Sequence, residues 1–400
     1  GTRLMTSITK TVFKGALARK ALYTGIAAAL FAAPLTASAY TFTDKSGKVE
    51  MSIGGYAKLS AIYSDTDSGS ISSELGRNIY LPSATPVGNG NDSQVLDFTA
   101  RESRINFKGK TEIDGHKVGM TLEIDFLGTS DGNEVVSNSY APRLRHYFFT
   151  FDNWLFGQTW STAMDTAALA ESVDFLAAPE GIVFIRQAMV RYSRGDFQVA
   201  LENPQSFVSD GTATGSTSGD VGVVPDLTGN YKFKLGGGHI RLNGLLRQVT
   251  VDQGTIDESE MGYGFGASGK IKVGQTDDIR FSAMYGDGMG RYTSLGLVRD
   301  GVLINNQIET VKSTILSAAY RHVWNAKSSS NIIFSTADID NPTGSPGSLN
   351  KGSTSIQINY LYRPVKQVTY GIMWLGAERE TENGNEGDLT RIQASAKYSF

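Results

Sequence analysis

Apolar and polar residues alternate along most of the chain after position 49. In the segment 49–63, one face carries residues such as Leu59 and Tyr63, and the opposite face carries Lys58 and Ser60. A period of two residues is typical of a β-strand with one apolar and one polar face. The segment also exceeds the ~9–11 residues that a tilted strand needs to cross a bilayer.

The same pattern recurs and gives sixteen expected strands. They span 49–63, 97–109, 117–127, 143–151, 153–159, 182–194, 196–203, 226–235, 238–250, 260–272, 277–287, 310–324, 328–337, 351–363, 366–379 and 387–400. The pattern therefore predicts an all-β fold, a 16-stranded antiparallel transmembrane β-barrel. The fifth and seventh strands carry the weakest pattern.

The connections between these strands alternate strictly between short turns and long loops. Asp114-Gly115 and Gly195-Asp196 are short turns, whereas 64–96 and 160–181 are long loops. This asymmetry is typical of transmembrane barrels, and an even number of strands puts both termini on the short-turn side. Charged residues on the polar face of nearly every strand would line a wet lumen, which favours a membrane barrel over a soluble sandwich.

Residues 1–39 have a different composition. Five basic and no acidic residues are found there, and an apolar stretch, 21–33, is followed by an A-x-A tripeptide that ends at Ala39. These are the three parts of a cleavable secretory signal. We expect translation to start at Met5, a signal peptide over 1–39 that is cleaved after Ala39, and a barrel pore over 40–400.

Composition excludes several other classes of protein. Without residues 1–39 the chain has 32 of its 37 basic residues and all 40 acidic residues, a net charge near −8 that argues against nucleic acid as a partner. Cysteine is absent, which excludes disulfides, thiolate metal sites and a cysteine nucleophile. The segment 264–269 reads G-x-G-x-x-G but lies inside an alternating strand, so it does not predict a nucleotide site. The four histidines are scattered, and we expect neither a metal nor a cofactor.

The loop 160–181 is the expected constriction, folded inward after a short strand. Its acidic residues are Asp165, Glu171, Asp174 and Glu180. The facing wall is expected to supply Arg104, Arg143, Arg145 and Arg191, with Arg101 and Arg186 nearby.

Two of these arginines, Arg104 and Arg191, alternate with apolar neighbours and should point into the lumen. Arg101 and Arg186 fall outside the alternation and require a β-bulge or a position above the membrane. Arginines opposite an acidic loop would create a transverse field, and charged rings of this kind set ion selectivity. Two guanidinium groups could hold both ends of a dicarboxylate. The alternative is that lumen arginines and acids only pair with each other and keep the pore wet.

Several segments resemble known outer-membrane proteins. The segment 154–161, WLFGQTWS, resembles the fifth strand and the start of the constriction loop of trimeric porins. Four further segments resemble the DcaP-type porins: 172–175 (SVDF), 179–188 (PEGIVFIRQA), 190–192 (VRY) and 225–228 (PDLT). The C-terminal residues Tyr398 and Phe400 resemble the signal by which barrels are recognised for assembly. The resemblance covers most of 40–400 and is most specific in its middle third.

The resemblance implies a homotrimer in the outer membrane of a Gram-negative bacterium, with small anions such as dicarboxylates as solutes. It also implies contacts with outer-membrane lipids and lipopolysaccharide, and assembly by the barrel-assembly machinery. Some members carry an N-terminal helical extension. Only about nine residues separate Ala39 from the first expected strand, so that extension is not expected here.

The sequence therefore predicts a porin, not an enzyme, for passive diffusion of small hydrophilic solutes with a preference for small anions. A general, non-specific porin is the first alternative. An outer-membrane hydrolase is the second, and it would need a Ser-His or Asp-His pair near the rim. Only His146 lies near other polar residues, no partner for it can be identified, and no G-x-S-x-G motif is present.

Overall fold

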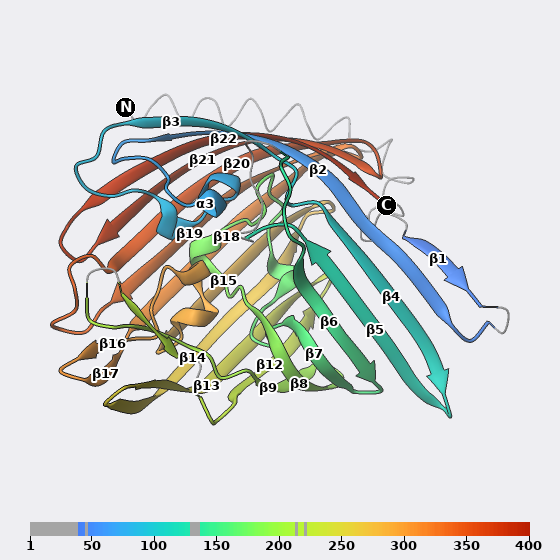
Figure 1. Cartoon of the computed structure of the whole chain (residues 1–400). Coiled ribbons are helices and arrows are strands. Elements are labelled where there is room, and N and C mark those ends of the chain that lie inside the picture. The colour runs from blue at the N-terminus through green and yellow to red at the C-terminus, as the bar shows by residue number, and fades with distance from the viewer. Residues whose placement is uncertain (1–38, 45–46, 129–136, 213–214, 220–221) are drawn as a thin grey trace.

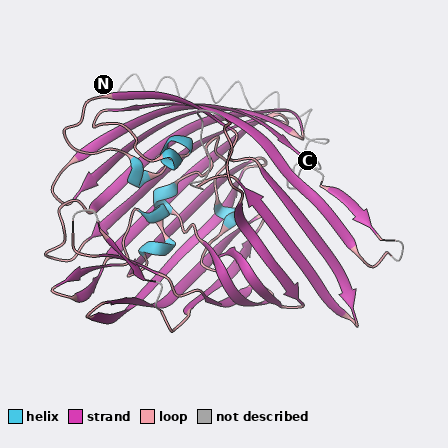
Figure 2. Cartoon of the chain, viewed as in Figure 1, coloured by secondary structure: helices cyan, strands magenta, loops and turns pink. Residues whose placement is uncertain are grey.

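The computed structural model describes residues 39–44, 47–128, 137–212, 215–219 and 222–400. Sixteen antiparallel strands form a closed barrel around several short helices (Figure 1 and Figure 2). The barrel strands are β2 (Glu50–Thr66), β3 (Ser93–Thr99) with β4 (Arg104–Ile113), β5 (His116–Asp125), β6 (Arg143–Phe151), β7 (Trp154–Trp160), β8 (Arg186–Arg194), β9 (Phe197–Glu202), β12 (Asp226–Leu235), β13 (Gly238–Gln253), β14 (Ile256–Val273), β15 (Asp277–Asp287), β18 (Lys312–Asn325), β19 (Ser328–Asp340), β20 (Asn350–Val365), β21 (Val368–Thr381) and β22 (Glu386–Ser399).

Strand β2 closes the barrel because its two edges pair with opposite ends of the chain. Tyr56 lies opposite Ser399 of β22 on one edge and opposite Arg104 of β4 on the other. Phe400 and Gly55 exchange two backbone hydrogen bonds of 3.1 Å, which fix the C-terminus at the short-turn end. A short strand that the alternation did not predict, β1 (Tyr40–Thr43), pairs with β2 at the same end. The predicted position of the C-terminal strand is therefore confirmed.

The predicted barrel of sixteen strands is confirmed, but three details of the prediction are wrong. The strand expected over 97–109 is interrupted at 100–103, where the chain turns between β3 and β4. The strand expected over 182–194 begins only at Arg186, because the residues before it belong to the inward loop. The strict alternation of loop lengths fails between β13 and β14, whose pairing continues until Gln253 faces Ile256 and leaves only two residues for the connection.

The two faces of the wall differ as the period of two requires. On β18, Leu316 and Tyr320 are exposed on the outer face, whereas Ser313 and Ser317 are buried on the inner face. In a transmembrane barrel the outer apolar residues meet lipid and the inner polar residues line the lumen. Among the described residues, no helix has the length and apolar composition needed to cross a bilayer.

Three long connections, 67–92, 161–185 and 288–311, fold into the barrel and contain its short helices. These helices are α3 (Glu74–Asn78), η1 (Pro82–Ala84), η2 (Thr166–Ala168), η3 (Pro179–Gly181), η4 (Gly290–Tyr292) and η5 (Ser294–Gly296). Figure 2 shows them inside the ring of strands. The barrel is therefore partly filled on its inner side, and the open cross-section is set by the loops as well as by the strands.

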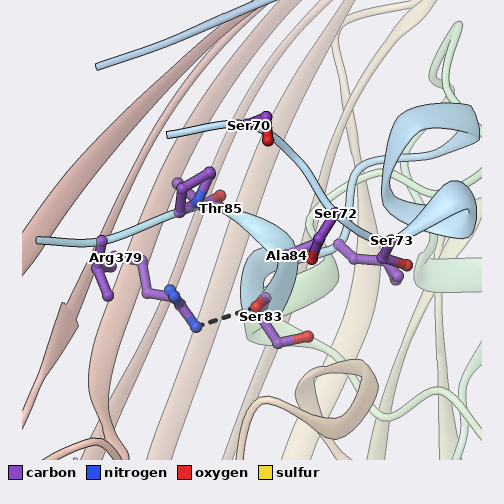
Figure 3. Close-up of a pocket in the computed structure, with 10 residues that line it drawn as sticks. Ser70, Ser72, Ser73, Ser83, Ala84, Thr85 and Arg379 are labelled. Carbon is purple, nitrogen blue, oxygen red and sulfur yellow. Dashed lines mark hydrogen bonds between the residues drawn. The ribbon is translucent and has the colours of Figure 1, made fainter. Parts of the chain in front are cut away.

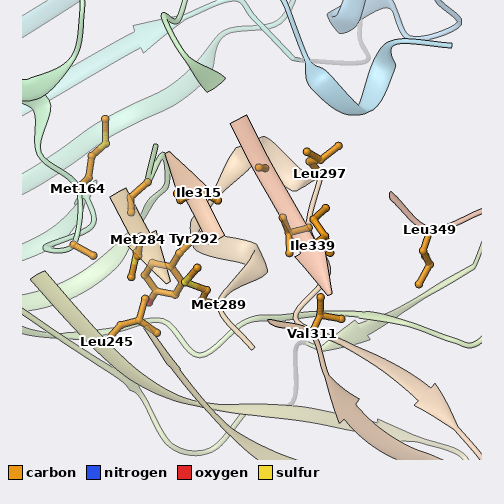
Figure 4. Close-up of a cluster of buried hydrophobic side chains, with 14 of the residues drawn as sticks. Met164, Leu245, Met284, Met289, Tyr292, Leu297, Val311, Ile315, Ile339 and Leu349 are labelled. Carbon is orange, nitrogen blue, oxygen red and sulfur yellow. The ribbon is translucent and has the colours of Figure 1, made fainter. Parts of the chain in front are cut away.

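An apolar cluster attaches the loops 161–185 and 288–311 to the wall (Figure 4). Met289 and Tyr292 of the loop 288–311 are fully buried against Met284 of β15 and Ile315 of β18. Burial of each such side chain contributes about 1.5–3 kcal/mol. The loop is therefore held by packing as firmly as an element of a soluble core.

The long connections 203–225 and 288–311 form a second, four-stranded sheet that the sequence did not predict. Its strands are β10 (Ser206–Ser209), β11 (Ser216–Gly219), β16 (Gly301–Ile304) and β17 (Gln307–Thr310). Strands of four residues are too short to show a period of two. Arg247 of β13 ties this sheet to the wall, since it lies 2.5 Å from Asp300 and 3.3 Å from Asp226 with all three side chains fully buried.

Replacement of Tyr292 by phenylalanine should destabilise the barrel. The Tyr292 hydroxyl donates to Asp226 Oδ2 at 2.8 Å and accepts from Gln187 Nε2 at 2.8 Å, and the ring is fully buried. Loss of these bonds is expected to cost about 1–3 kcal/mol and to lower the temperature at which the barrel shows heat-modified electrophoretic migration. Tyr360→Phe, an outer-face tyrosine that is 43% exposed, is the control and should leave that temperature unchanged. Equal temperatures for Tyr292→Phe and the unmodified protein would contradict this assignment.

Candidate channel constriction

The loop between β7 and β8, residues 161–185, crosses the lumen and follows the inner wall from β12 round to β2. Its backbone carbonyls accept hydrogen bonds from wall side chains. The donors and the carbonyls that they bind are Asn230 to Thr162, Asn243 to Ala163, Arg241 to Met164, Arg280 to Leu169, Asn359 to Glu171, and Gln393 and Lys58 to Val173. Because buried carbonyls need partners, this series of donors defines the path of the loop.

Close contact with the wall also depends on Gly181. A Cβ atom at Gly181 would lie 2.0 Å from the Leu316 carbonyl oxygen of β18. The Gly181 N–H donates to Ser335 Oγ of β19 at 2.8 Å. Any larger residue at this position would therefore push the loop away from the wall and into the lumen.

The first two predicted acidic residues of the loop are bound on the wall. Asp165 Oδ2 lies 2.7 Å from His239 Nε2 and 2.9 Å from Ser268 Oγ. Glu171 accepts from Arg363 at 2.9 Å and lies 3.6 Å from Arg321. Burial alone would raise the pKa of the Glu171 carboxyl, but these two arginines outweigh burial and hold that pKa below its ordinary value.

The other two predicted acids bind the inward loop 67–92. Asp174 accepts from the Tyr80 N–H at 2.7 Å, and Glu180 accepts from the Tyr80 hydroxyl at 2.5 Å and from Ser355 Oγ at 2.8 Å. Burial raises the pKa of the Glu180 carboxyl above its ordinary value. Burial also raises the pKa of Asp174, although Arg391 opposes the shift. Tyr80 therefore joins the two loops through a pair of buried carboxyl groups.

The expected arrangement of arginines opposite loop acids is not what the structure contains. The four loop acids bind His239, Ser268, Arg363, Tyr80 and Ser355 in place of the arginines expected from the sequence. The reason is that the loop acids are needed to fix the loop to the wall and to Tyr80. The carboxylates that meet Arg104, Arg143 and Arg145 come from the wall itself, whereas Arg101 pairs with Glu74 of α3.

Those wall carboxylates are Glu123 and Asp125 of β5. Arg143 makes two hydrogen bonds of 2.8 Å to Asp125, and Arg145 reaches Glu123 at 2.7 Å and Asp125 at 2.9 Å. A bulge in the pairing of β5 with β6 accompanies these contacts.

Arg104 and Arg186 complete the group, which we call the arginine cluster: Arg104, Arg143, Arg145 and Arg186. Arg104 lies 3.4 Å from Glu123, whereas Arg186 has no ion pair within the described chain and one buried nitrogen without a hydrogen bond. Four guanidinium groups thus share two carboxylates, an excess of two positive charges.

Aromatic rings of the loop and of its two ends face the arginine cluster. Phe175 lies 5.5 Å from the Arg145 guanidinium carbon and 5.9 Å from that of Arg104. Arg186 lies 4.5 Å from the ring of Trp160. In the described part of the chain, no hydrogen bond joins residues 163–184 to β4, β5 or β6. The loop thus meets this side of the wall only through ring faces, which attract cations without neutralising them.

Two of the predicted arginines lie elsewhere. Arg191 points inward as its alternation predicted, but it donates to Trp160 O and to Thr162 Oγ1 at 2.8 Å and so holds the start of the loop. Arg101 lies in the interruption between β3 and β4, as its irregular position suggested. It pairs with Glu74 of α3 and lies 3.8 Å from the ring of Tyr140.

A second basic group, which the sequence pattern did not predict, lies elsewhere on the lumen wall. Arg280, Arg321 and Arg363, on β15, β18 and β20, surround Glu171 and Asp278. Arg280 and Arg363 alternate with apolar neighbours on their strands, so their inward orientation could have been predicted. Their gathering around Glu171 could not, because it depends on the path of the loop.

The remaining predictions concern the C-terminal residues, the signal peptide and metal binding. Tyr398 is an exposed outer-face residue of β22, and its ring centroid lies 6.2 Å from that of Phe400. The expected signal peptide lies outside the described residues except for Ala39. Among the described residues, no group of three or more histidine or acidic side chains is placed to hold a metal ion.

The histidine of the hydrolase alternative, His146, lies 3.0 Å from Thr159 Oγ1 and 3.9 Å from Glu123 Oε1. Glu123 is bound more closely by Arg145, and both His146 and Thr159 are buried. These contacts belong to the hydrogen-bond network of the lumen wall.

Comparison with known proteins agrees with this geometry. The barrel is similar to the outer-membrane channel DcaP of Acinetobacter baumannii, with a TM-score of 0.74 and 22% identity over 90% of this chain and 99% of that one. It also resembles OmpF of Salmonella typhi, with a TM-score of 0.56, 11% identity and coverage of 90% and 100%, and OmpT of Vibrio cholerae, with a TM-score of 0.52, 10% identity and the same coverage. Comparison with curated proteins gave no match. The model of the DcaP outer membrane protein family matches residues 46–400, so the chain belongs to that family and is a porin-type channel of the outer membrane.

Proposed function

We propose that the channel passes small hydrophilic solutes by diffusion and favours small anions, including dicarboxylates. The observation that carries this proposal is the arginine cluster, in which four arginines share two carboxylates. The proposed passage runs beside this cluster, on the side of the lumen where, among the described residues, the loop makes no hydrogen bonds to β4, β5 or β6. An excess of positive charge at the narrowest section of a pore attracts anions and repels cations.

The preference for dicarboxylates is supported by the second basic group on the far side of the lumen. Arg280, Arg321 and Arg363, together with Lys270, share Glu171 and Asp278, which leaves two further positive charges. A solute with a carboxylate at each end can bind one basic group with each of its carboxylates as it passes. Arginine suits this role because its planar group can bond both oxygens of a carboxylate and stays protonated.

We also propose that the channel is a homotrimer whose subunits meet through the outer faces of the short strands β6 to β9. These faces carry Tyr147, Phe149 and Trp154, each more than two-fifths exposed, and Phe149 stacks on Phe156 at 5.1 Å. Export with cleavage after Ala39, recognition of Tyr398 and Phe400 by the barrel-assembly machinery, and contact with lipopolysaccharide complete the proposal.

Single-channel recording tests the solute preference. Succinate or phthalate should cause brief current blocks, and Arg104→Gln should shorten the blocks about tenfold, as expected for the loss of one charge-assisted hydrogen bond. Lys234→Gln removes an exposed charge at the short-turn rim and is the control. A conducting pore without blocks would be a general porin, and a protein without any conductance would return the hydrolase alternative.

A further inference from the structure

Two adjoining cavities open at the long-loop end of the barrel, above the constriction loop. Their volumes are about 340 and 280 Å³. Ser83 and Arg379 line both of them, so the two cavities meet at these side chains (Figure 3). Sites for small molecules begin at about 300 Å³, so the larger cavity can accept one small solute.

Arg379, near the end of β21, is the charged group at this junction. Its Nη1 donates to the Ser83 carbonyl at 3.0 Å and to Asn350 Oδ1 at 3.1 Å. Within the described chain, its Nε and Nη2 make no hydrogen bond, and it has no carboxylate within ion-pair distance. A half-buried guanidinium without a counter-ion is costly, and an anionic ligand would remove that cost.

The second cavity repeats this feature. Arg299 lines it and lies 3.8 Å from the ring of Phe207, and it too lacks an ion pair among the described residues. One of its terminal nitrogens is buried without a hydrogen bond. No aspartate or glutamate lines either cavity. The two cavities therefore present two arginines without a carboxylate in their lining, which suits an anionic ligand.

Hydroxyl groups supply the other polar side chains of the larger cavity, which is also lined by Leu81, Ala84, Pro86 and Val87. Ser70, Ser72, Ser73, Ser83 and Thr85 line it together with Arg379 (Figure 3). The hydroxyls of Ser70 and Ser72 make no hydrogen bond within the described chain, and Thr85 Oγ1 is buried without one. Hydroxyls can both donate and accept, so this rim matches a ligand that carries several hydroxyls of its own.

We propose that these cavities form a capture site for a small hydroxylated carboxylate, such as a sugar acid, upstream of the constriction. The carboxylate binds the free edge of Arg379, and the hydroxyls of the ligand bond to Ser70, Ser72 and Thr85. The site rests on the proposed function only in that the captured anion then passes the arginine cluster. The contacts within the arginine cluster do not depend on the capture site.

Calorimetry on the detergent-solubilised full chain tests the site with D-gluconate as the probe. Gluconate should bind saturably, and Arg379→Gln should weaken binding about tenfold, the loss expected for one bidentate contact. Sorbitol, which has the hydroxyls without the charge, and hexanoate, which has the charge without the hydroxyls, should both bind more weakly than gluconate. Hexanoate binding as tight as that of gluconate would overturn the proposal.

Further variants separate the site from the fold and from the constriction. Ser70→Ala with Ser72→Ala leaves the bonds of Arg379 intact, and should weaken gluconate binding without changing hexanoate binding. Lys234→Gln, at the short-turn rim, should leave gluconate binding unchanged. Gluconate binding that is lost in Arg186→Gln but retained in Arg379→Gln would place the ligand at the constriction and overturn the capture site.

The failure of this site can be distinguished from the failure of the proposed function. An anion-selective channel that does not bind gluconate overturns this site alone, whereas a non-selective channel with Arg379-dependent binding overturns the proposed function alone.

Discussion

Replacement of Arg186 by glutamate is expected to abolish anion preference in the channel. Arg186 is the member of the arginine cluster without an ion pair, so its charge is not cancelled locally. A unit charge about 5 Å from a permeating ion in a water-like medium changes its energy by about 0.8 kcal/mol, or about fourfold in local concentration. Arg186→Glu changes the local charge by two units, so the anion-to-cation permeability ratio should fall by more than that factor.

The variant should still fold, because the new carboxylate has partners in place. Arg145, Arg143 and Arg104 all lie within electrostatic range of position 186. Lys234→Glu makes the same change of charge on a side chain that is 73% exposed at the short-turn rim, and is the control. The zero-current potential in a salt gradient measures both variants. A potential for Arg186→Glu equal to that of the unmodified channel would show that the passage does not run past the arginine cluster.

Replacement of Glu180 by alanine should release the constriction loop from Tyr80 and from β20. Glu180 is fully buried and is the shared acceptor of the Tyr80 and Ser355 hydroxyls. Its removal leaves two buried donors unsatisfied at about 1–3 kcal/mol each, and opens a cavity between the two loops. We expect noisy, larger single-channel currents and faster cleavage of the loop by protease.

Glu180→Gln is the matched control, since it keeps an acceptor and resembles the protonated acid. Because burial raises the pKa of Glu180, the folded protein binds this proton more tightly than the unfolded chain does. The stability from this group is therefore complete below the ordinary pKa of 4.5 and is lost as pH rises through the raised value. Current noise should increase over that range in the unmodified channel and stay constant in Glu180→Gln. Quiet currents from Glu180→Ala would refute the role of this carboxyl.

The strands of the barrel wall can be predicted from the sequence because the alternation of apolar and polar residues is a local signal. A period of two fixes which side chains of a strand face inward, so Arg104 and Arg191 could be oriented from their neighbours. The irregular positions of Arg101 and Arg186 likewise indicated breaks in the pattern. The strands β13 and β14 were underestimated at their long-loop ends, where polar residues such as Asp257 and Glu258 hide the continuing ladder.

The partners of the loop residues could not be predicted because they are set by contacts far apart in the chain. Asp165 meets His239, and Glu180 meets Tyr80, across separations of 74 and 100 residues. Tyr80 carries no local signal that distinguishes it from other loop tyrosines. The net charge of the chain does not indicate the charge of the lumen wall, since four arginines share two carboxylates in the arginine cluster although acidic residues outnumber basic ones.

The most direct test of the account is the zero-current potential of the unmodified channel in a planar bilayer under a potassium chloride gradient. The proposed passage beside the arginine cluster predicts a potential of the sign that chloride selectivity gives, and one that shrinks as salt screens the charges. A potential of the opposite sign, or none at low salt, would contradict the claim that the arginine cluster controls the passage.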